Sequence, residues 1–200
     1  MAQASNSERE LASAPIGKLM VRLALPAVLA QFINVLYNVV DRIYIGHIPG
    51  TGALALTGVG VTMPIILLIS AFAAFAGMGG APLASIQLGA GNRERAERIL
   101  SNSFSMLLIL SVVLTIFFRA FSRPLLYAFG ASDNIIDYGL SYINLYVLGT
   151  VFVQLALGLN TFISAQGHAT TAMLSVLIGA VTNIVLDPIL IFVFNMRGPG

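Results

Sequence analysis

The sequence contains no cysteine and only two histidines, His47 and His168, among its 200 residues. The lack of cysteine excludes disulfides and cysteine-ligated metals, and two histidines so far apart do not indicate a zinc site. Charged residues make up 9% of the chain, whereas an ordinary soluble domain contains about 25%. With 58% hydrophobic residues and a mean hydropathy of +0.91, the composition excludes a soluble globular fold and indicates a polytopic membrane protein.

Long apolar stretches dominate the sequence. Since a transmembrane helix needs about 20 mostly apolar residues, we expect an all-α polytopic membrane protein with five membrane-spanning helices. Turn and breaker residues separate the spans, and residues 119–137 form the longest expected connection. The expected spans are Leu23–Ile45, Leu54–Met78, Ile99–Phe118, Tyr138–Ile163 and Ala172–Phe194.

Residues 1–15 form a polar tail that lacks the basic start and cleavage site of a secretory signal. Lysine and arginine placement predicts the orientation, because cytoplasmic loops carry an excess of these residues. Six lie on the side of the N-terminus and three on the other, which predicts a cytoplasmic tail and a location in the plasma or inner membrane. The six are Arg9, Lys18, Arg22, Arg93, Arg95 and Arg98, and the three are Arg119, Arg123 and Arg197.

The connection between the second and third spans carries charges at helical spacing. Glu94 precedes Arg98 by four residues, and Arg93 precedes Glu97 by four. Opposite charges at this spacing pair on one face of a helix. The pattern predicts a solvated amphipathic helix at the inner membrane surface.

Polar side chains on the first span lie 3, 4 and 3 residues apart, which confines them to an arc of roughly 80° on a helix. They are Gln31, Asn34, Asn38 and Asp41, with Tyr37 on one flank. Such an arc cannot face lipid. Hydrogen bonds between helices would account for Gln31 and Asn38 alone, but for the set that ends in Asp41 we favour a cavity lining. Arg42 either pairs with Asp41 or, as we favour, extends to the outer interface.

The fifth span carries small and polar residues at intervals of four, so they share one drifting helix face. They are Ser175, Gly179, Asn183 and Asp187. Pro188 has no backbone N–H and leaves the carbonyl of Ile184 without its usual partner. A carbonyl, an amide oxygen and a carboxylate within one turn suit Na⁺, whereas a proton needs only a buried carboxylate. The alternative is a kinked helix whose aspartate bonds a neighbouring side chain.

Carboxylates at membrane depth cost free energy and are typical of ion or substrate pathways. We therefore expect Asp41, Asn183 and Asp187 to form one site. Two nearby carboxylates would share protons, or hold one cation, and release them as access changes. This is the chemistry of a coupled transporter rather than of an enzyme.

Further residues are candidates for the cavity and for bends. Asn160 on the fourth span could line the cavity, and Met173 suits an adaptable apolar pocket, although methionine in a bundle more often serves packing. Pro26, Pro64 and Pro188 are candidate kinks or hinges. Three tyrosines at intervals of four indicate an aromatic belt at the outer interface. They are Tyr138, Tyr142 and Tyr146.

Several motifs in this order resemble those of one transporter family. They are LALPAVLAQFINVLYNVVDRIYIGH in the first span, GALALTGVGVTMPI in the second, FISAQGHATTAM entering the fifth and NIVLDPILIF within it. From about Ile16 to Phe194 the chain resembles the multidrug and toxic compound extrusion (MATE) transporters of the bacterial and archaeal type.

The resemblance implies a twelve-helix protein with two six-helix lobes related by pseudo-two-fold symmetry. Such proteins export cationic amphipathic drugs in exchange for Na⁺ or H⁺ and need no other cofactor. The resemblance also implies roles for particular residues. Asp41, Asn183 and Asp187 match the cation site, Tyr37 and Asn160 match the cavity of the N-terminal lobe, and Pro26 matches a proposed bend.

Residues 16–200 would correspond to most of the N-terminal lobe, without helix 6 and the second lobe. Since alternating access needs two lobes that rock against each other, we expect the chain to work as part of a longer protein. A half that pairs with a second copy is the less favoured alternative. The expected partners are the C-terminal lobe, the lipid bilayer and cationic small molecules, and not nucleic acid.

Three other functions are open. A lipid-linked oligosaccharide flippase of the same superfamily would share the fold, but the polar stripes here hold amides and carboxylates rather than cations for a pyrophosphate. An inactive structural fragment is the second. An intramembrane prenyl transferase is disfavoured, because the turn after Asp187 offers Ile191 instead of a further carboxylate.

Overall fold

The computed structural model describes residues 15–48 and 50–188, apart from the side chains at positions 18, 19 and 186–188. The described residues are helices joined by short turns, without a strand among them, as expected for an all-α protein. The helices are α2 (Ile16–Gly46), α3 (Gly52–Gly89), α4 (Arg93–Ala128), α5 (Ile136–Leu148), α6 (Thr150–Ala165) and α7 (Ala169–Pro188).

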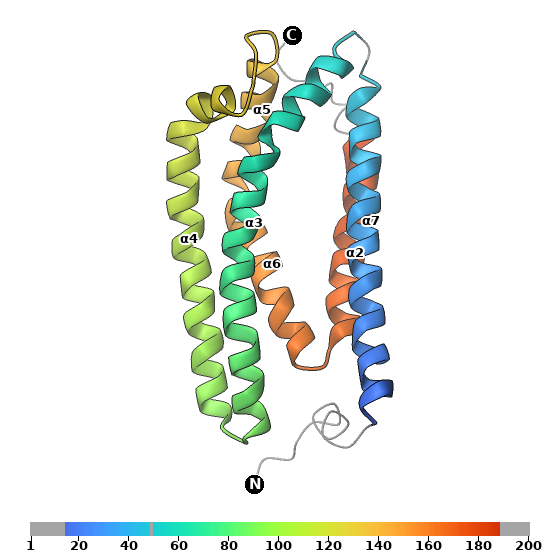
Figure 1. The fold of residues 1–200 in the computed structure, drawn as a ribbon, viewed down its shortest axis with the longest axis vertical. Helices are drawn as coiled ribbons and strands as arrows, with labels where there is room; N and C mark the ends of the chain where they lie inside the picture. The colour runs from blue at the N-terminus through green and yellow to red at the C-terminus, as the bar shows by residue number, and fades with distance from the viewer. Residues whose placement is uncertain (1–14, 49, 189–200) are drawn as a thin grey trace.

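The helices form two groups (Figure 1). Helices α3, α4, α5 and α6 pack together in a bundle, and α2 and α7 lie side by side next to it. The colours of Figure 1 show that α2 and α7 run in the same direction, although most of the described chain separates them. Helix α7 also packs against α6, and α2 against α3, so the pair is attached to the bundle on both sides.

Close packing holds the bundle together. Lipid is as apolar as a leucine side chain, so helices in a membrane associate mainly where their surfaces fit closely. A Cβ at Gly77 of α3 would lie 2.8 Å from the carbonyl oxygen of Gly158 on α6 and would also meet Thr161. Leu107 of α4 fills the space beside Gly158 and is fully buried. Glycine at position 77 therefore lets the backbones of α3 and α6 touch, and glycine at position 158 leaves room for Leu107 of α4.

Three described helices are long and apolar enough to cross a membrane, and the α5–α6 pair makes a fourth crossing if it counts as one bent span. The spanning segments are Met20–Gly46, Gly52–Gly89 and Arg93–Ala128. The apolar part of α7, Ala169–Val185, is shorter, and the rest of the fifth expected span lies outside the described residues. Of the predicted polar tail, only Pro15 is described.

The prediction that residues 119–137 form a connection is wrong over its first half. Helix α4 continues to Ala128, because the stripe that it buries continues past the apolar run through Phe118, Ser122 and Leu126. A hydrogen bond of 2.8 Å from Arg119 to the side-chain oxygen of Asn144 joins this extension to α5. The arginine that marked the end of the predicted span thus contributes to packing between helices.

The fourth expected span is broken rather than continuous. Its two halves, α5 and α6, meet at Gly149 with a bend of 59°. The carbonyl of Val147 next to the break accepts a hydrogen bond of 3.1 Å from the hydroxyl of Thr115 on α4. This bond replaces part of the helical hydrogen bonding that the bend removes.

The predicted ion pairs at the start of the third span are confirmed. Arg98 lies 2.7 Å from Glu94, and Arg93 lies 3.3 Å from Glu97. The segment is the first two turns of α4, capped by the side chain of Asn92 through the N–H of Arg95. It therefore continues directly into the membrane span.

Candidate functional site

The polar stripes of the first and fifth spans lie on two helices that pack against each other, α2 and α7. Because these helices run in the same direction (Figure 1), Asp41 of α2 and Asn183 of α7 lie toward the same end of the pair. Asp41 is half-buried and has an interaction partner. Asp187 follows Asn183 by one turn of α7, but its side chain and that of Pro188 lie outside the described part of the structure.

On α2, the predicted cavity residues differ in exposure. Asn34, Tyr37 and Asn38 are half-buried, whereas Gln31 is exposed. The side-chain amide of Asn38 donates a hydrogen bond of 2.7 Å to the carbonyl of Asn34 within the same helix. One donor of Asn38 is thus satisfied without a second helix.

Two predicted cavity residues lie where α6 meets α7. The hydroxyl of Ser175 on α7 is 3.3 Å from the side-chain oxygen of Asn160 on α6, and 2.7 Å from the carbonyl of Ala172. A hydroxyl has one proton, so these two acceptors share it. Met173 is half-buried at the start of α7. Asn160 and Ser175 link the bundle to the α2–α7 pair.

The side-chain oxygen of Asn183 is buried and has no hydrogen-bond partner in the described structure. A buried acceptor without a hydrogen bond lowers the stability of the fold by roughly 1–3 kcal/mol. Such a group in a native fold therefore indicates a bound ion, water or ligand at this position. An amide oxygen suits a hard cation or a hydrogen-bond donor on a ligand. Within the described residues, no three Asp, Glu or His side chains gather as a metal cluster.

Two residues of this region escaped the sequence prediction. Tyr146 of α5 interacts with the side chain of Ser70 on α3 and with Tyr37 on α2. It also stacks on Tyr142, with ring centres 6.3 Å apart. Ser70 is the one hydroxyl residue between Met63 and Ala84 of α3, and this isolated polar residue could have marked the contact in the sequence.

The three tyrosines are half-buried and pack against neighbouring helices, and their place in an aromatic belt stays a prediction. Tyr138 and Tyr142 are half-buried and pack against a cluster of Ile45, Ile48, Ala55 and Val59 where α2 meets α3. Tyr146 packs against the core of the bundle. Tyr138 and Tyr142 thus fill space between α5 and the ends of α2 and α3.

Other polar residues of the sequence have structural contacts. Gln154 is fully buried in α6, and its amide donates a hydrogen bond of 2.8 Å to the carbonyl of Ile69 on α3. Arg42 is exposed, with Nη2 at 3.4 Å from the sulfur of Met63 on α3. Pro26 and Pro64 lie inside α2 and α3, which continue through them as helices.

Two surface cavities lie elsewhere than at the proposed coupling residues. One, of about 560 Å³, lies between α3 and α4. The other, of about 360 Å³, lies where Arg42 and His47 approach Leu56. Neither is lined by Asp41, Asn160 or Asn183.

Comparison with known proteins establishes the family. The family model described as MatE matches residues 26–189. The chain belongs to the MATE family. The match covers the polar stripes of both α2 and α7, so the resemblance seen in the motifs is confirmed over nearly the whole chain.

Relatives of the chain include proteins named for different transported molecules. The multidrug export protein MepA of Staphylococcus haemolyticus is 28% identical over 185 residues, which cover 92% of this chain and 40% of that protein. An FAD transporter of Shewanella oneidensis is 27% identical over 182 residues, covering 91% of this chain and 40% of the other. The chain therefore spans about two fifths of the length of these relatives.

Solved structures agree with the described fold. A crystal structure of a MATE transporter in the bent conformation matches with a TM-score of 0.89 at 28% identity, over 98% of this chain and 43% of that one. The straight conformation matches with a TM-score of 0.87, over 98% and 42%. The all-α fold is thus that of part of a MATE transporter, a membrane protein.

Proposed function

We propose that the transporter to which these helices belong exports cationic amphipathic small molecules across the plasma or inner membrane in exchange for H⁺ or Na⁺. Family membership and the multidrug export named for MepA support the export of drugs. One structural observation carries the coupling part of the proposal. It is the parallel α2–α7 pair, with half-buried Asp41 and the unpartnered oxygen of Asn183 toward the same end.

The coupling ion would bind to Asp41, Asn183 and Asp187. Two carboxylates and an amide supply the oxygen ligands that hard cations prefer. In the proton version, one carboxyl takes up a proton and loses it when water reaches the site from the other side of the membrane. The unpartnered oxygen of Asn183 fits either version, since it accepts a carboxyl proton or contacts the metal ion.

The substrate would bind beside this site, among Gln31, Asn34, Tyr37, Asn38, Asn160 and Met173. The carboxylate of Asp41 attracts a cation, and the ring of Tyr37 adds a cation–π contact. The Ser175–Asn160 hydrogen bond joins this region to the bundle. The same carboxylate would bind either the cationic substrate or the coupling ion. The substrate and the ion would then compete for the site, and this competition couples the export of one to the import of the other.

The N-terminus would lie in the cytoplasm. This orientation follows from the excess of lysine and arginine before α2 and at the α3–α4 turn. It places the end of α2 that carries Asp41 in the outer half of the membrane.

The experiment uses the complete transporter in proteoliposomes loaded with a fluorescent cationic dye. Imposed Na⁺ and pH gradients are applied separately, and the gradient that drives dye movement identifies the ion. Asp41→Asn and Asp187→Asn keep the side-chain shape and remove the charge, so we expect both to reduce gradient-driven transport to background. Asp137→Asn, at an exposed position of α5, is the matched control and retains transport.

Gradient-driven dye transport at the normal rate in both variants would contradict the proposed coupling site. Transport of FAD or of a lipid diphosphate, without transport of the cationic dye, would contradict the proposed substrate class. The first result leaves the substrate intact and the second leaves the ion site intact, so the two halves of the proposal are tested separately.

A further inference from the structure

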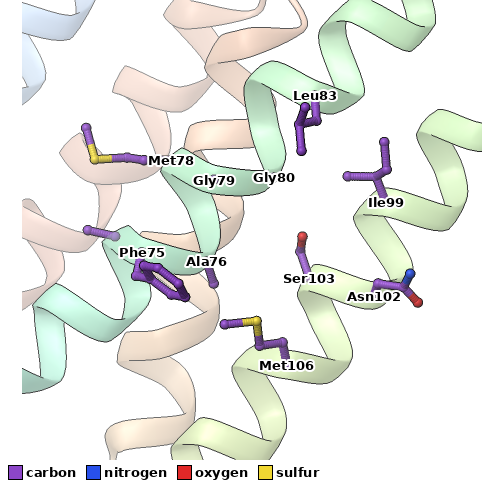
Figure 2. A pocket seen from close by; sticks show the side chains of 11 residues that line it. Phe75, Ala76, Met78, Gly79, Gly80, Leu83, Ile99, Asn102, Ser103 and Met106 are labelled. Atoms are coloured by element: carbon purple, nitrogen blue, oxygen red, sulfur yellow. The ribbon is translucent and has the colours of Figure 1, made fainter.

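The groove between α3 and α4 has mostly apolar walls, and none of the proposed coupling residues lines it. Figure 2 shows Phe75, Ala76 and Leu83 of α3 on one side and Ile99, Ser103 and Met106 of α4 on the other. The groove encloses about 560 Å³. Both helices are long and apolar enough to cross a membrane, and the side chain of Phe75 is 68% exposed.

The length of the groove fits one leaflet of a bilayer. Its α3 wall runs from Ala74 to Leu83, a rise of roughly 13 Å along a helix. Its α4 wall runs from Ile99 to Met106, a rise of roughly 10 Å. Half of a hydrocarbon core is about 15 Å thick. An acyl chain lying in the groove would therefore pass through most of one leaflet.

Arg95 lies on the same face of α4 as the groove, closer to the start of the helix. Arg95 precedes Ile99, Asn102 and Met106 by 4, 7 and 11 residues, which puts all four within one narrow face of the helix. Side chains on a helix lean toward its N-terminus, so Arg95 extends from the groove toward the membrane surface.

Arg95 also differs from its neighbours in charge pairing. Arg93 pairs with Glu97 at 3.3 Å, and Arg98 pairs with Glu94 at 2.7 Å. Arg95 forms no such pair within the described residues, and its side chain is exposed. The turn thus presents one uncompensated positive charge, at the position that continues the groove.

We propose that the groove holds an acyl chain of an anionic phospholipid, with the lipid phosphate bound by Arg95. An acyl chain fills an apolar slot of leaflet depth, and a phosphate compensates the guanidinium that the turn leaves unpaired. The apolar groove and Arg95 lie on one face of α4. A lipid can occupy both at once, whereas a free anion would bind Arg95 and leave the groove empty.

The absence of tryptophan from the chain allows a direct test. A Phe75→Trp variant of the complete transporter, in vesicles, carries an added reporter on the groove wall, and the fluorescence of the unsubstituted transporter is subtracted. Lipids with brominated acyl chains quench tryptophan that they touch. We expect brominated phosphatidylglycerol to reach half-maximal quenching at an about fivefold lower mole fraction than brominated phosphatidylcholine. This factor corresponds to the attraction between one arginine and an anionic lipid surface.

Two pairs of matched variants separate charge from shape. Arg95→Gln removes the preference for phosphatidylglycerol, whereas Arg93→Gln, with the same change in net charge, keeps it. Gly79→Leu fills the groove, because a side chain there meets open space, and it reduces quenching by both lipids. Gly60→Leu adds the same side chain in open space elsewhere on α3 and leaves quenching unchanged.

Three results would overturn the proposal. The first is equal quenching by the two lipids in the reporter variant. The second is an equal loss of preference in Arg93→Gln and Arg95→Gln, which would show a general charge effect. The third is a tryptophan that neither lipid quenches, which would show that protein, such as a second copy of the chain, covers the groove.

Discussion

The α3–α6 bundle and the α2–α7 pair differ in how they bury their residues. In the bundle, Ile65, Leu107 and Ile143 are fully buried, and glycines bring two backbones into contact. In the most apolar 18-residue segment of α2, by contrast, no residue is buried. In the corresponding segment of α3, 33% of the residues are buried. The bundle has the packing of a stable scaffold, whereas α2 and α7 contain the polar stripes. Packing and chemistry are therefore divided between the two regions.

The largest expected effect tests the packing of the bundle. Gly77→Ala places a methyl group against the carbonyl of Gly158, so the backbones must separate, and we expect a loss of about 2–3 kcal/mol in unfolding free energy. Unfolding of the chain in mixed micelles, titrated with sodium dodecyl sulfate and followed by circular dichroism, measures this loss. Gly79→Ala, which meets open space on the same helix, is the control and changes stability by less than about 1 kcal/mol. Equal stability of the two variants would show that α3 and α6 do not touch as described.

The next effect concerns the bend between α5 and α6. Thr115→Val keeps the side-chain shape and removes the hydrogen bond to the carbonyl of Val147. We expect a loss of about 1 kcal/mol in the same titration. Thr57→Val removes a hydroxyl that bonds only within its own helix, to the carbonyl of Ala53, and is the control. A larger loss in Thr57→Val would mean that the bond across the bend is not special.

A substitution in the α2–α7 pair should act in the opposite direction on stability. Asn183→Leu removes a buried oxygen without a described partner, so we expect unfolding free energy to stay constant or rise by up to about 1 kcal/mol. Gradient-driven dye transport by the complete transporter should nevertheless fall to background. A strongly destabilised Asn183→Leu variant would mean that this side chain supports the fold, and would weaken the division between the two regions.

The smallest effect is expected in the charged first turns of α4, at one end of the bundle. Arg98→Gln breaks an ion pair whose two side chains are 76% and 78% exposed. Exposed pairs contribute less than about 0.5 kcal/mol, so the unfolding titration should shift only slightly. A loss above about 1 kcal/mol would show that this turn stabilises the bundle.

The sequence predicted the helices and their class well, because apolar length and turn residues are local signals. It failed where packing decides the outcome. Arg119 was read as the end of a span, yet its contact with Asn144 helps α4 to continue to Ala128. No proline in the sequence marks the bend at Gly149. The bend is stabilised partly by the hydrogen bond from Thr115 of α4 to the carbonyl of Val147.

The candidate site was predictable only in part. Helical spacing grouped the polar residues of α2 and of α7, and the described structure packs these two helices together. The hydrogen bond between Tyr146 and Ser70 joins α5 to α3, and no pattern within one helix reveals such a contact. The role of Asp187 stays a prediction, since its side chain is outside the described residues.

The parallel pairing of α2 and α7 also has a consequence during synthesis. Roughly 120 residues separate the end of α2 from the start of α7, and translation at about 5–20 residues per second needs on the order of 10 s to make them. During this interval α2 is in the membrane before its main packing partner exists. The polar stripe of the nascent α2 must therefore face water or other polar groups until α7 arrives.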